Sequence, residues 1–204
     1  MTVQAGSVTR TQLAPGGTLP AAGRPGGGLP RGGIQVRTAS AADCAAIKSF
    51  VAGLSLRARY LRFFTPAATP SPAVLRGLCG AGRTTDVLVA TAGRTVIGHA
   101  MTADAVGPDG GRVTDIGLVV ADRWQNHGVG SDLLERIVAR AAARGVSGLE
   151  LEVLPENRPM LAMIRHRWTD AGYEYGGGSV TVRVRLADSP ETKGGCRGTA
   201  PRAA

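Results

Sequence analysis

A short glycine-containing segment joins an apolar stretch to an amphipathic one, and this junction restricts the possible folds more than any other part of the chain. The apolar stretch, residues 113–120, has the length and composition of a buried strand. After the glycines, apolar residues recur at helical spacing, which predicts a helix that ends near Gly145. A second strand is predicted at 148–154. A strand, a helix and a strand in this order form a βαβ unit, whose two strands are parallel.

The junction itself has the chemistry of a phosphate-binding loop. Its residues are Gln125, Asn126, His127, Gly128, Val129, Gly130 and Ser131. The first turn of a helix presents unpaired N–H groups and the positive end of the helix dipole, and glycine lets that backbone approach an anion closely. The loop lacks both the Lys-Ser/Thr pair of a P-loop and the third glycine of a dinucleotide-binding fold. Such a loop can bind a pyrophosphate without the help of a metal ion, and it can equally be a simple tight turn between a strand and a helix.

The other patterns predict a mixed sheet with flanking helices. The predicted strands are 34–37, 86–91, 95–105, 113–120, 148–154 and 180–186. Helices are predicted from the Ser40 cap to Leu54, at 56–64, after Ser71-Pro72, after the glycine loop and at 157–171. In the last strand, Val180, Val182, Val184 and Leu186 are expected to face inward. This order predicts an α/β fold of the mixed α+β kind, with a mostly antiparallel sheet around a central βαβ unit.

Composition separates a body of domain size from two tails. Residues 1–33 hold 9 Gly and 4 Pro and have neither an acidic residue nor an apolar period. Such a segment buries too little surface to offset its ordering entropy, so we predict that it is disordered. Residues 188–204 have a similar composition and are predicted to be a second disordered tail. The body, 34–187, has the size of one domain.

The charge and the cysteines suggest partners and a compartment. The formal net charge of +9 comes almost entirely from Arg, as in proteins of GC-rich genomes, so it gives little support to nucleic-acid binding. No apolar run is long enough to cross a bilayer, and the N-terminus does not resemble a secretion signal. Cys44, Cys79 and Cys196 lie far apart without metal-ligand spacing. We therefore predict reduced thiols in a cytoplasmic protein.

Three residues of the loop carry a resemblance to a known family. Gln125-x-x-Gly128-x-Gly130, which follows the strand that ends at Val120, resembles the acetyl-CoA motif of the GNAT N-acetyltransferases. The resemblance implies transfer of an acetyl group from acetyl-CoA to a primary amine, with no metal. It also implies that amides of residues 125–131 hold the pyrophosphate and that Asn157 contacts the arm of the cofactor. The backbone of Leu118, Val119 and Val120 is expected to pair with the pantetheine.

A second stretch resembles a narrower group. Residues 55–64, together with Asp122-x-Trp124-Gln125, look like the acetyltransferase domain of bacterial protein-lysine acetyltransferases that modify acyl-CoA synthetases. This resemblance adds a protein lysine to the acceptors that the family implies, which are a protein N-terminus and small amines. Many members of the family form dimers, so a homodimer is also among the expectations. Arg57, Arg59 and Arg62 could line the path of an acidic substrate, but the default interpretation is a solvated helix face.

The catalytic residues depart from the pattern that the resemblance implies. Similar lysine acetyltransferases have a Glu on the strand before the cofactor loop, and here that position is Asp115. We expect Asp115 to act as the general base through a water molecule, because Asp is one methylene shorter. A strand N–H, such as that of Val119 or Val120, is expected to stabilise the thioester oxygen. Ile164 stands where many members have a catalytic Tyr, so a CoA-binding sensor or adaptor without turnover is the alternative.

Overall fold

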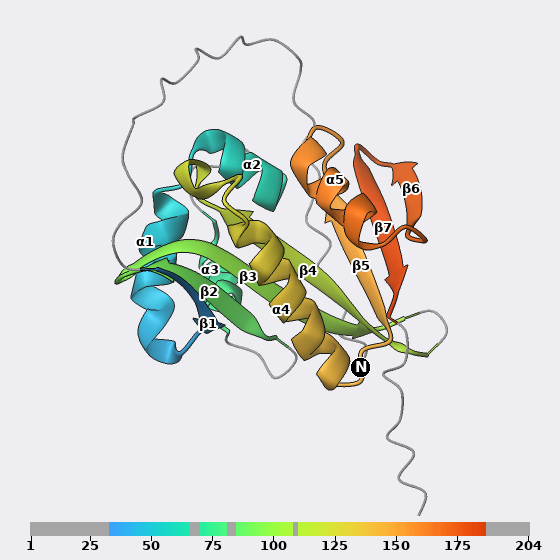
Figure 1. Ribbon diagram of the computed structural model, residues 1–204, viewed down its shortest axis with the longest axis horizontal. Helices are drawn as coiled ribbons and strands as arrows, with labels where there is room; N and C mark the ends of the chain where they lie inside the picture. The colour runs from blue at the N-terminus through green and yellow to red at the C-terminus, as the bar shows by residue number, and fades with distance from the viewer. Residues whose placement is uncertain (1–32, 66–69, 81–84, 108–109, 187–204) are drawn as a thin grey trace, which may run out of the picture.

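The computed structural model describes residues 33–65, 70–80, 85–107 and 110–186 (Figure 1). The tails predicted at 1–33 and 188–204 lie outside these residues, apart from Gly33. A seven-stranded sheet in the order β1-β2-β3-β4-β5-β7-β6 forms the centre of the protein. Its neighbouring strands are antiparallel except for β4 and β5, which are parallel. The predicted mixed sheet with a central βαβ unit is therefore confirmed.

The predicted elements recur with small shifts at their ends. The strands are β1 Ile34–Thr38, β2 Val87–Ala92, β3 Thr95–Val106, β4 Arg112–Val120, β5 Gly148–Val153, β6 Gly172–Gly176 and β7 Ser179–Arg185. The helices are α1 Cys44–Ala52, α2 Leu56–Phe63, α3 Pro72–Leu78, α4 Val129–Ala143 and α5 Arg158–Arg167, with 3₁₀ turns η1 Ala41–Asp43 and η2 Asp122–Trp124. Ser40 and Asp43 form the expected capping box. No helix among the described residues is long and apolar enough to span a membrane.

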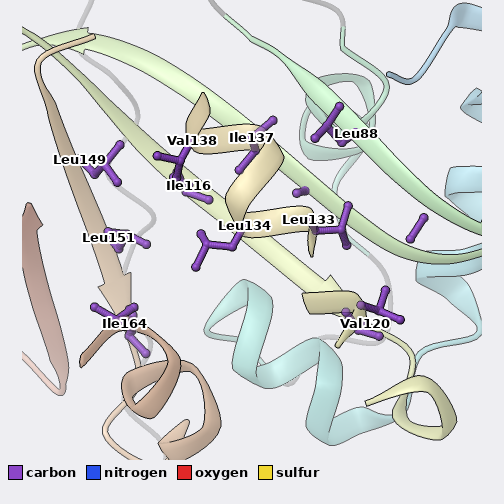
Figure 2. Packing of buried hydrophobic residues seen from close by; sticks show 14 of the residues in the cluster. Leu88, Ile116, Val120, Leu133, Leu134, Ile137, Val138, Leu149, Leu151 and Ile164 are labelled. Carbon is purple, nitrogen blue, oxygen red and sulfur yellow. The ribbon is translucent and has the colours of Figure 1, made fainter. Parts of the chain in front are cut away.

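Helices cover both faces of the sheet, and each face has its own core. On one face, α4 and α5 pack on the strands through residues such as Leu133, Ile137 and Ile164 (Figure 2). On the other face, α1, α2 and α3 pack around Val89 and Val119. Close approach of α4 to the sheet depends on Gly98, because a Cβ there would lie only 2.9 Å from the side chain of Leu133.

The two parallel strands separate soon after they meet. Only Val113–Asp115 of β4 pair with Gly148–Glu150 of β5. Farther along, β4 keeps its antiparallel partner β3 as far as Val120, but β5 pairs on its other side with β7 alone. A gap therefore opens inside the sheet beside the end of β4, next to the N-terminal ends of α4 and α5.

The C-terminal part of the domain, from the end of α5 onward, differs from the sequence prediction. The helix predicted to reach about Ala171 ends at Arg167, and Trp168 is already extended. The strand β6 begins at Gly172 and forms a hairpin with β7 across the turn at Gly177 and Gly178, both of which have a positive φ. Along β7 the valines face inward, as expected, while Arg183 and Arg185 are exposed.

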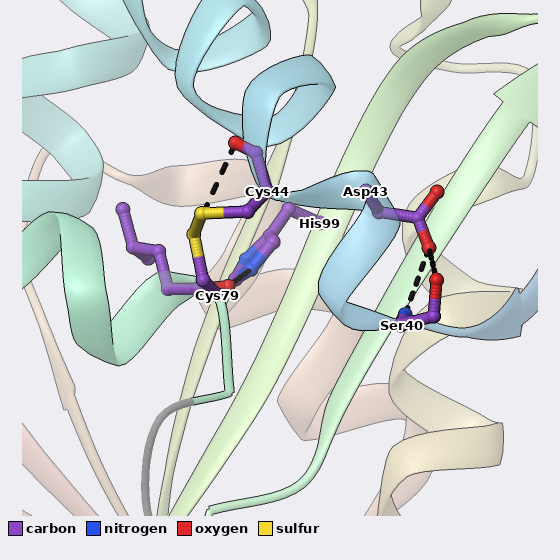
Figure 3. Close-up of a disulfide and its surroundings, with 6 residues drawn as sticks. Ser40, Asp43, Cys44, Cys79 and His99 are labelled. Carbon is purple, nitrogen blue, oxygen red and sulfur yellow. Dashed lines mark hydrogen bonds between the residues drawn. A yellow bond between two sulfur atoms is a disulfide. The ribbon is translucent and has the colours of Figure 1, made fainter.

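Cys44 and Cys79 form a disulfide bond between the start of α1 and the end of α3, with their Cα atoms 5.1 Å apart (Figure 3). The prediction of reduced thiols is therefore wrong for these two residues, and Cys196 lies outside the described residues. Their separation of 35 residues gave no sign of pairing, because pairing depends on how α1 and α3 pack against each other. The cytoplasmic location rested partly on reduced thiols and remains a prediction.

A histidine on β3 is completely buried beside the end of α3. The Nε2 atom of His99 lies 2.9 Å from the carbonyl oxygen of Leu78, so Nε2 carries the proton and donates it (Figure 3). No described residue provides a partner for Nδ1. Burial lowers the pKa of His99 to about 4; the hydrogen bond to Leu78 opposes this shift, and the charge of Arg62 adds to it.

We expect this histidine to make the fold sensitive to mild acid. Its pKa is lower in the folded chain than in the unfolded one, where it is about 6.5, so the unfolded chain takes up the proton first as the pH falls. The contribution of His99 to the free energy of unfolding is fully present above pH 6.5. It decreases by about 3 kcal/mol as the pH drops toward 4. Urea unfolding across this range should show a larger loss for the natural protein than for His99→Gln. Equal losses in the two proteins would contradict the assignment.

Candidate active site

A cleft of about 280 Å³ opens where β4 and β5 separate. Its walls come from α2, the end of β4, the loop before α4 and the first turns of α4 and α5. The lining residues are Arg57, Ala58, Leu61, Arg62, Leu118, Val119, Val120, Gln125, Asn126, Gly128, Gly130, Ser131, Asn157, Pro159, Met160 and Met163. Segments that lie far apart in the sequence therefore meet around one concave surface at the end of the central strand.

The glycine loop at one end of this cleft has a fixed backbone geometry. Gly128 is the N-cap of α4 with φ +79°, and Asn126 also has a positive φ of 62°. The side chain of Gln125 donates from Nε2 to the carbonyl oxygen of Val120 at 3.0 Å, which ties the loop to the end of β4. A Cβ at Gly130 would lie 3.8 Å from the side chains of Leu118 and Val120. The backbone at the start of α4 thus lies at the surface of the cleft.

The structure brings most of the predicted cofactor residues together. All of them line the cleft except His127 and Val129. His127 is exposed, and its Nδ1 lies 2.7 Å from the carbonyl oxygen of Gln125. The side chain of Val129 is buried in the core, which leaves only its backbone for a ligand. Asn157 caps α5 by accepting a hydrogen bond at Oδ1 from the Met160 amide, at 3.4 Å.

Past Asp115, the edge of β4 that faces the gap has no partner among the described strands, and only every second residue points its backbone N–H and C=O groups toward this gap. The Ala121 amide donates to the carbonyl oxygen of Ile97 on β3, at 2.9 Å. Because backbone groups alternate in direction along a strand, those of Val119 also point toward β3, whereas those of Leu118 and Val120 point into the gap. Of the two amides expected to stabilise a thioester oxygen, Val120 is therefore the one that faces the cleft.

Asp115 lies on β4 outside the lining of the cleft. By strand alternation it shares a face with Gly117 and Val119, the face that α2 covers. Its side chain is exposed, yet desolvation is the largest influence on its pKa, which is raised. A carboxylate that contacts water while protein atoms surround much of it shows both properties. The positive charge of Arg62 lowers the pKa of Asp115, and the negative charges of Glu152 and Glu150 raise it further.

Arg62 is the residue for which the default interpretation of the sequence is wrong. The default placed it on a solvated helix face, but it lines the cleft, as the alternative had it, and is only partly accessible. Its guanidinium group lies on the backbone of Gly117, where a Cβ would overlap with Nη2 and Cζ. The spacing of Arg57, Arg59 and Arg62 alone gave no reason to single it out. A glycine within an otherwise apolar strand, at 117, was the available signal of a close neighbour.

The position of the family's Tyr and the next tyrosine along the chain, Tyr173, both lie away from the cleft. Ile164, at the position of the family's Tyr, is fully buried in the core. Tyr173 is on β6 and packs against the same core, and no described residue hydrogen-bonds its hydroxyl group. In the described part of the chain, no group of three or more His, Cys, Asp or Glu side chains is arranged to hold a metal ion.

A protein-family model and several solved structures match this chain. The model of the acetyltransferase (GNAT) family matches residues 55–167, a range that includes α2, the residues lining the cleft and the whole of α5. No curated protein matches the chain.

Several solved structures have the same fold. The GNAT domain of PAT from S. lividans is 26% identical with a TM-score of 0.66, over 75% of this chain and 90% of that one. YncA from Salmonella typhimurium, solved with its cofactor acetyl-CoA, is 19% identical with a TM-score of 0.57, over 84% and 99% of the two chains. A phosphinothricin acetyltransferase from Sinorhizobium meliloti, in complex with acetyl-CoA, is 19% identical with a TM-score of 0.56, over 78% and 92%.

Proposed function

The chain belongs to the acetyltransferase (GNAT) family, and on this premise we propose that it moves the acetyl group of acetyl-CoA to a primary amine. The observation that carries the proposal is the cleft, which combines a glycine loop at a helix N-terminus with an unpaired strand edge. The first feature suits a pyrophosphate and the second suits the amide-containing pantetheine. We further propose that the body, residues 34–187, contains the whole site.

Each part of the cleft has a role in holding the cofactor. The backbone at Gly128, Gly130 and Ser131 would hold the pyrophosphate, because the unpaired amides of a first helical turn favour anions. The inward-facing groups of Leu118 and Val120 would pair with the amides of the pantetheine. Gln125 keeps loop and strand together through its bond to Val120. Asn157 and the side chains at the start of α5 would close the opposite wall.

The chemistry requires a neutral amine and a place for its proton. In the proposed reaction, the amine nitrogen bonds to the acetyl carbon, the carbon–sulfur bond breaks, and CoA leaves as a thiolate that takes up a proton from solvent. Asp115 accepts the proton that the amine loses, through a water molecule, because it lies beside the cleft rather than in its lining. The Val120 amide would stabilise the negative charge that develops on the carbonyl oxygen.

The test of this function uses the full-length protein and two measurements. Titration calorimetry with acetyl-CoA and with CoA should give dissociation constants in the micromolar range. Mass spectrometry should then detect acetylated product with a panel of lysine peptides, peptide N-termini and small amines. Failure to bind either form of CoA would overturn the proposal.

The alternative function is a CoA-binding sensor or adaptor. It is motivated by Asp115 in place of Glu and by Ile164 in place of Tyr, since both changes remove groups that relatives use. Normal binding of acetyl-CoA, with no transfer to any amine of the panel, would establish this alternative.

A protein lysine is the acceptor that the sequence resemblance favours. Residues 55–64 resemble protein-lysine acetyltransferases, and the GNAT domain of S. lividans PAT is a similar structure. The panel therefore includes lysine peptides alongside free amino acids, and the electrostatics of the cleft bear on the choice between them.

A further inference from the structure

The cleft contains a cation that forms no ion pair with any described residue, although its guanidinium carbon lies 5.2 Å from the centre of the Phe63 ring. Arg62 is partly accessible, but its Nε is excluded from solvent and has no acceptor among the described residues. None of the ion pairs in the described part of the chain includes Arg62. Burial lowers the pKa of Arg62, and Asp115 raises it through its charge, yet these two groups form no ion pair. A guanidinium group stays charged in proteins, so this site holds a desolvated positive charge.

Such a charge is costly unless something compensates for it. Removing a cation from water costs several kcal/mol, and other arginines of this chain, such as Arg144, are paired with carboxylates. The flat, five-donor guanidinium group binds carboxylates and other oxyanions best, often through two parallel hydrogen bonds. The arrangement therefore calls for an oxyanion that enters the cleft with a ligand.

The pyrophosphate of the cofactor is not that oxyanion. The glycine loop follows the end of β4 at Val120, whereas the guanidinium group of Arg62 lies on Gly117. Three residues of strand separate these positions by about 10 Å. Along the same face, Gly117 stands between Asp115 and Val119, which is where an amine must lie to reach both the base and the thioester.

We propose that Arg62 binds an oxyanion carried by the acceptor, so that the acceptor is a free amino acid or a similar small amine with a carboxylate close to its nitrogen. This inference rests on the proposed acetyl transfer and narrows its substrate class. The carboxylate would bind the fork of Arg62 while the amine lies between Asp115 and the thioester. The missing side chain at Gly117 is what allows the guanidinium group to occupy this position.

The test compares each amino acid with its own C-terminal amide as acceptor. For the natural protein, we expect kcat/KM to be about 100-fold higher for the best amino acid than for its amide, the effect of one charged hydrogen-bonding pair. Aminomethylphosphonate tests whether another oxyanion can replace the carboxylate. Calorimetry of the same amino acid with the CoA-saturated protein, which requires no turnover, should show binding that the amide lacks.

Two variants test the role of Arg62 itself. Arg62→Met removes the charge at similar volume, and Gly117→Ala keeps Arg62 but displaces its guanidinium group. Both should reduce the preference for the amino acid over its amide to less than about 5-fold, with unchanged acetyl-CoA affinity as the sign of an intact fold. Arg57→Met, in the same helix and cleft, is the matched control and should keep the preference.

The outcomes separate this inference from the proposed function. If amides, lysine peptides or simple amines react as well as amino acids, the oxyanion proposal is overturned and acetyl transfer stands. An equal loss of kcat/KM for the amino acid and its amide in Arg62→Met also overturns the oxyanion proposal, because Arg62 would then act only through its charge on Asp115. If no amino acid binds or reacts, the proposal also fails; when no amine of any kind reacts, the transferase function fails with it.

Discussion

Gly128→Glu should reduce the affinity for acetyl-CoA by about 100-fold or more, which corresponds to about 2.7 kcal/mol of binding free energy. Gly128 is the N-cap of α4 in a left-handed conformation, with no other atom within 4 Å of the place where a Cβ would lie. A Glu there strains the backbone and brings a negative charge to the amides that should bind the pyrophosphate. Titration calorimetry with acetyl-CoA measures the loss directly.

The other end of the same helix provides a matched control. Gly145 also has a left-handed φ, +77°, with open space around it, but it follows the C-terminal end of α4 away from the cleft. Gly145→Glu introduces a similar backbone strain and the same charge, so its acetyl-CoA affinity should stay unchanged. Equal affinities in the two variants would show that the loop does not hold the cofactor.

Asp115→Asn should lower kcat/KM by about 100-fold, the usual contribution of a general base. The pH profile should also change. A protonated amine alone makes log kcat/KM fall with a slope of about one toward low pH, and protonation of Asp115 steepens the slope to about two. Because desolvation raises the pKa of Asp115, this second limb should lie above the usual carboxylate range. The variant should keep only the shallower slope.

Glu150 serves as the control for this experiment, because it pairs with Asp115 across β4 and β5 and is also exposed. Glu150→Gln removes a nearby negative charge without removing the base, so the rate should change little. Asp115→Glu should retain the steeper acid limb. An unaltered pH profile in Asp115→Asn would exclude Asp115 as the base.

Much of the fold follows from local patterns in the sequence. Ser40, Ser55 and Ser71 precede helices, and the period of two along residues 180–186 identifies β7 with its buried face. These signals involve residues close in sequence, so a short window contains them. The predicted helix after Asn157 was too long because its polar end carries no stop signal before Gly172, where β6 begins.

The features that the sequence did not predict depend on contacts between distant segments. The pair of Cys44 and Cys79 requires that the ends of two helices meet on one face of the sheet. The position of Arg62 depends on how α2 crosses β4, and its partner in this contact is a residue without a side chain. Neither periodicity nor composition contains such information. The glycine loop between β4 and α4 was predictable because strand, glycines and helix are adjacent in the sequence.

The disulfide has a consequence for the wall of the cleft. Residues 44–79 form a covalent ring that includes the whole of α2, and hence Arg57, Leu61 and Arg62. Closing a ring of this size removes about 3–4 kcal/mol of conformational entropy, expressed as free energy, from the unfolded chain. When the bond is intact, α2 can leave the sheet only as part of a loop whose two ends stay together. In a reducing environment the same wall depends on packing alone, so the redox state of its surroundings sets how firmly α2 is held against the sheet.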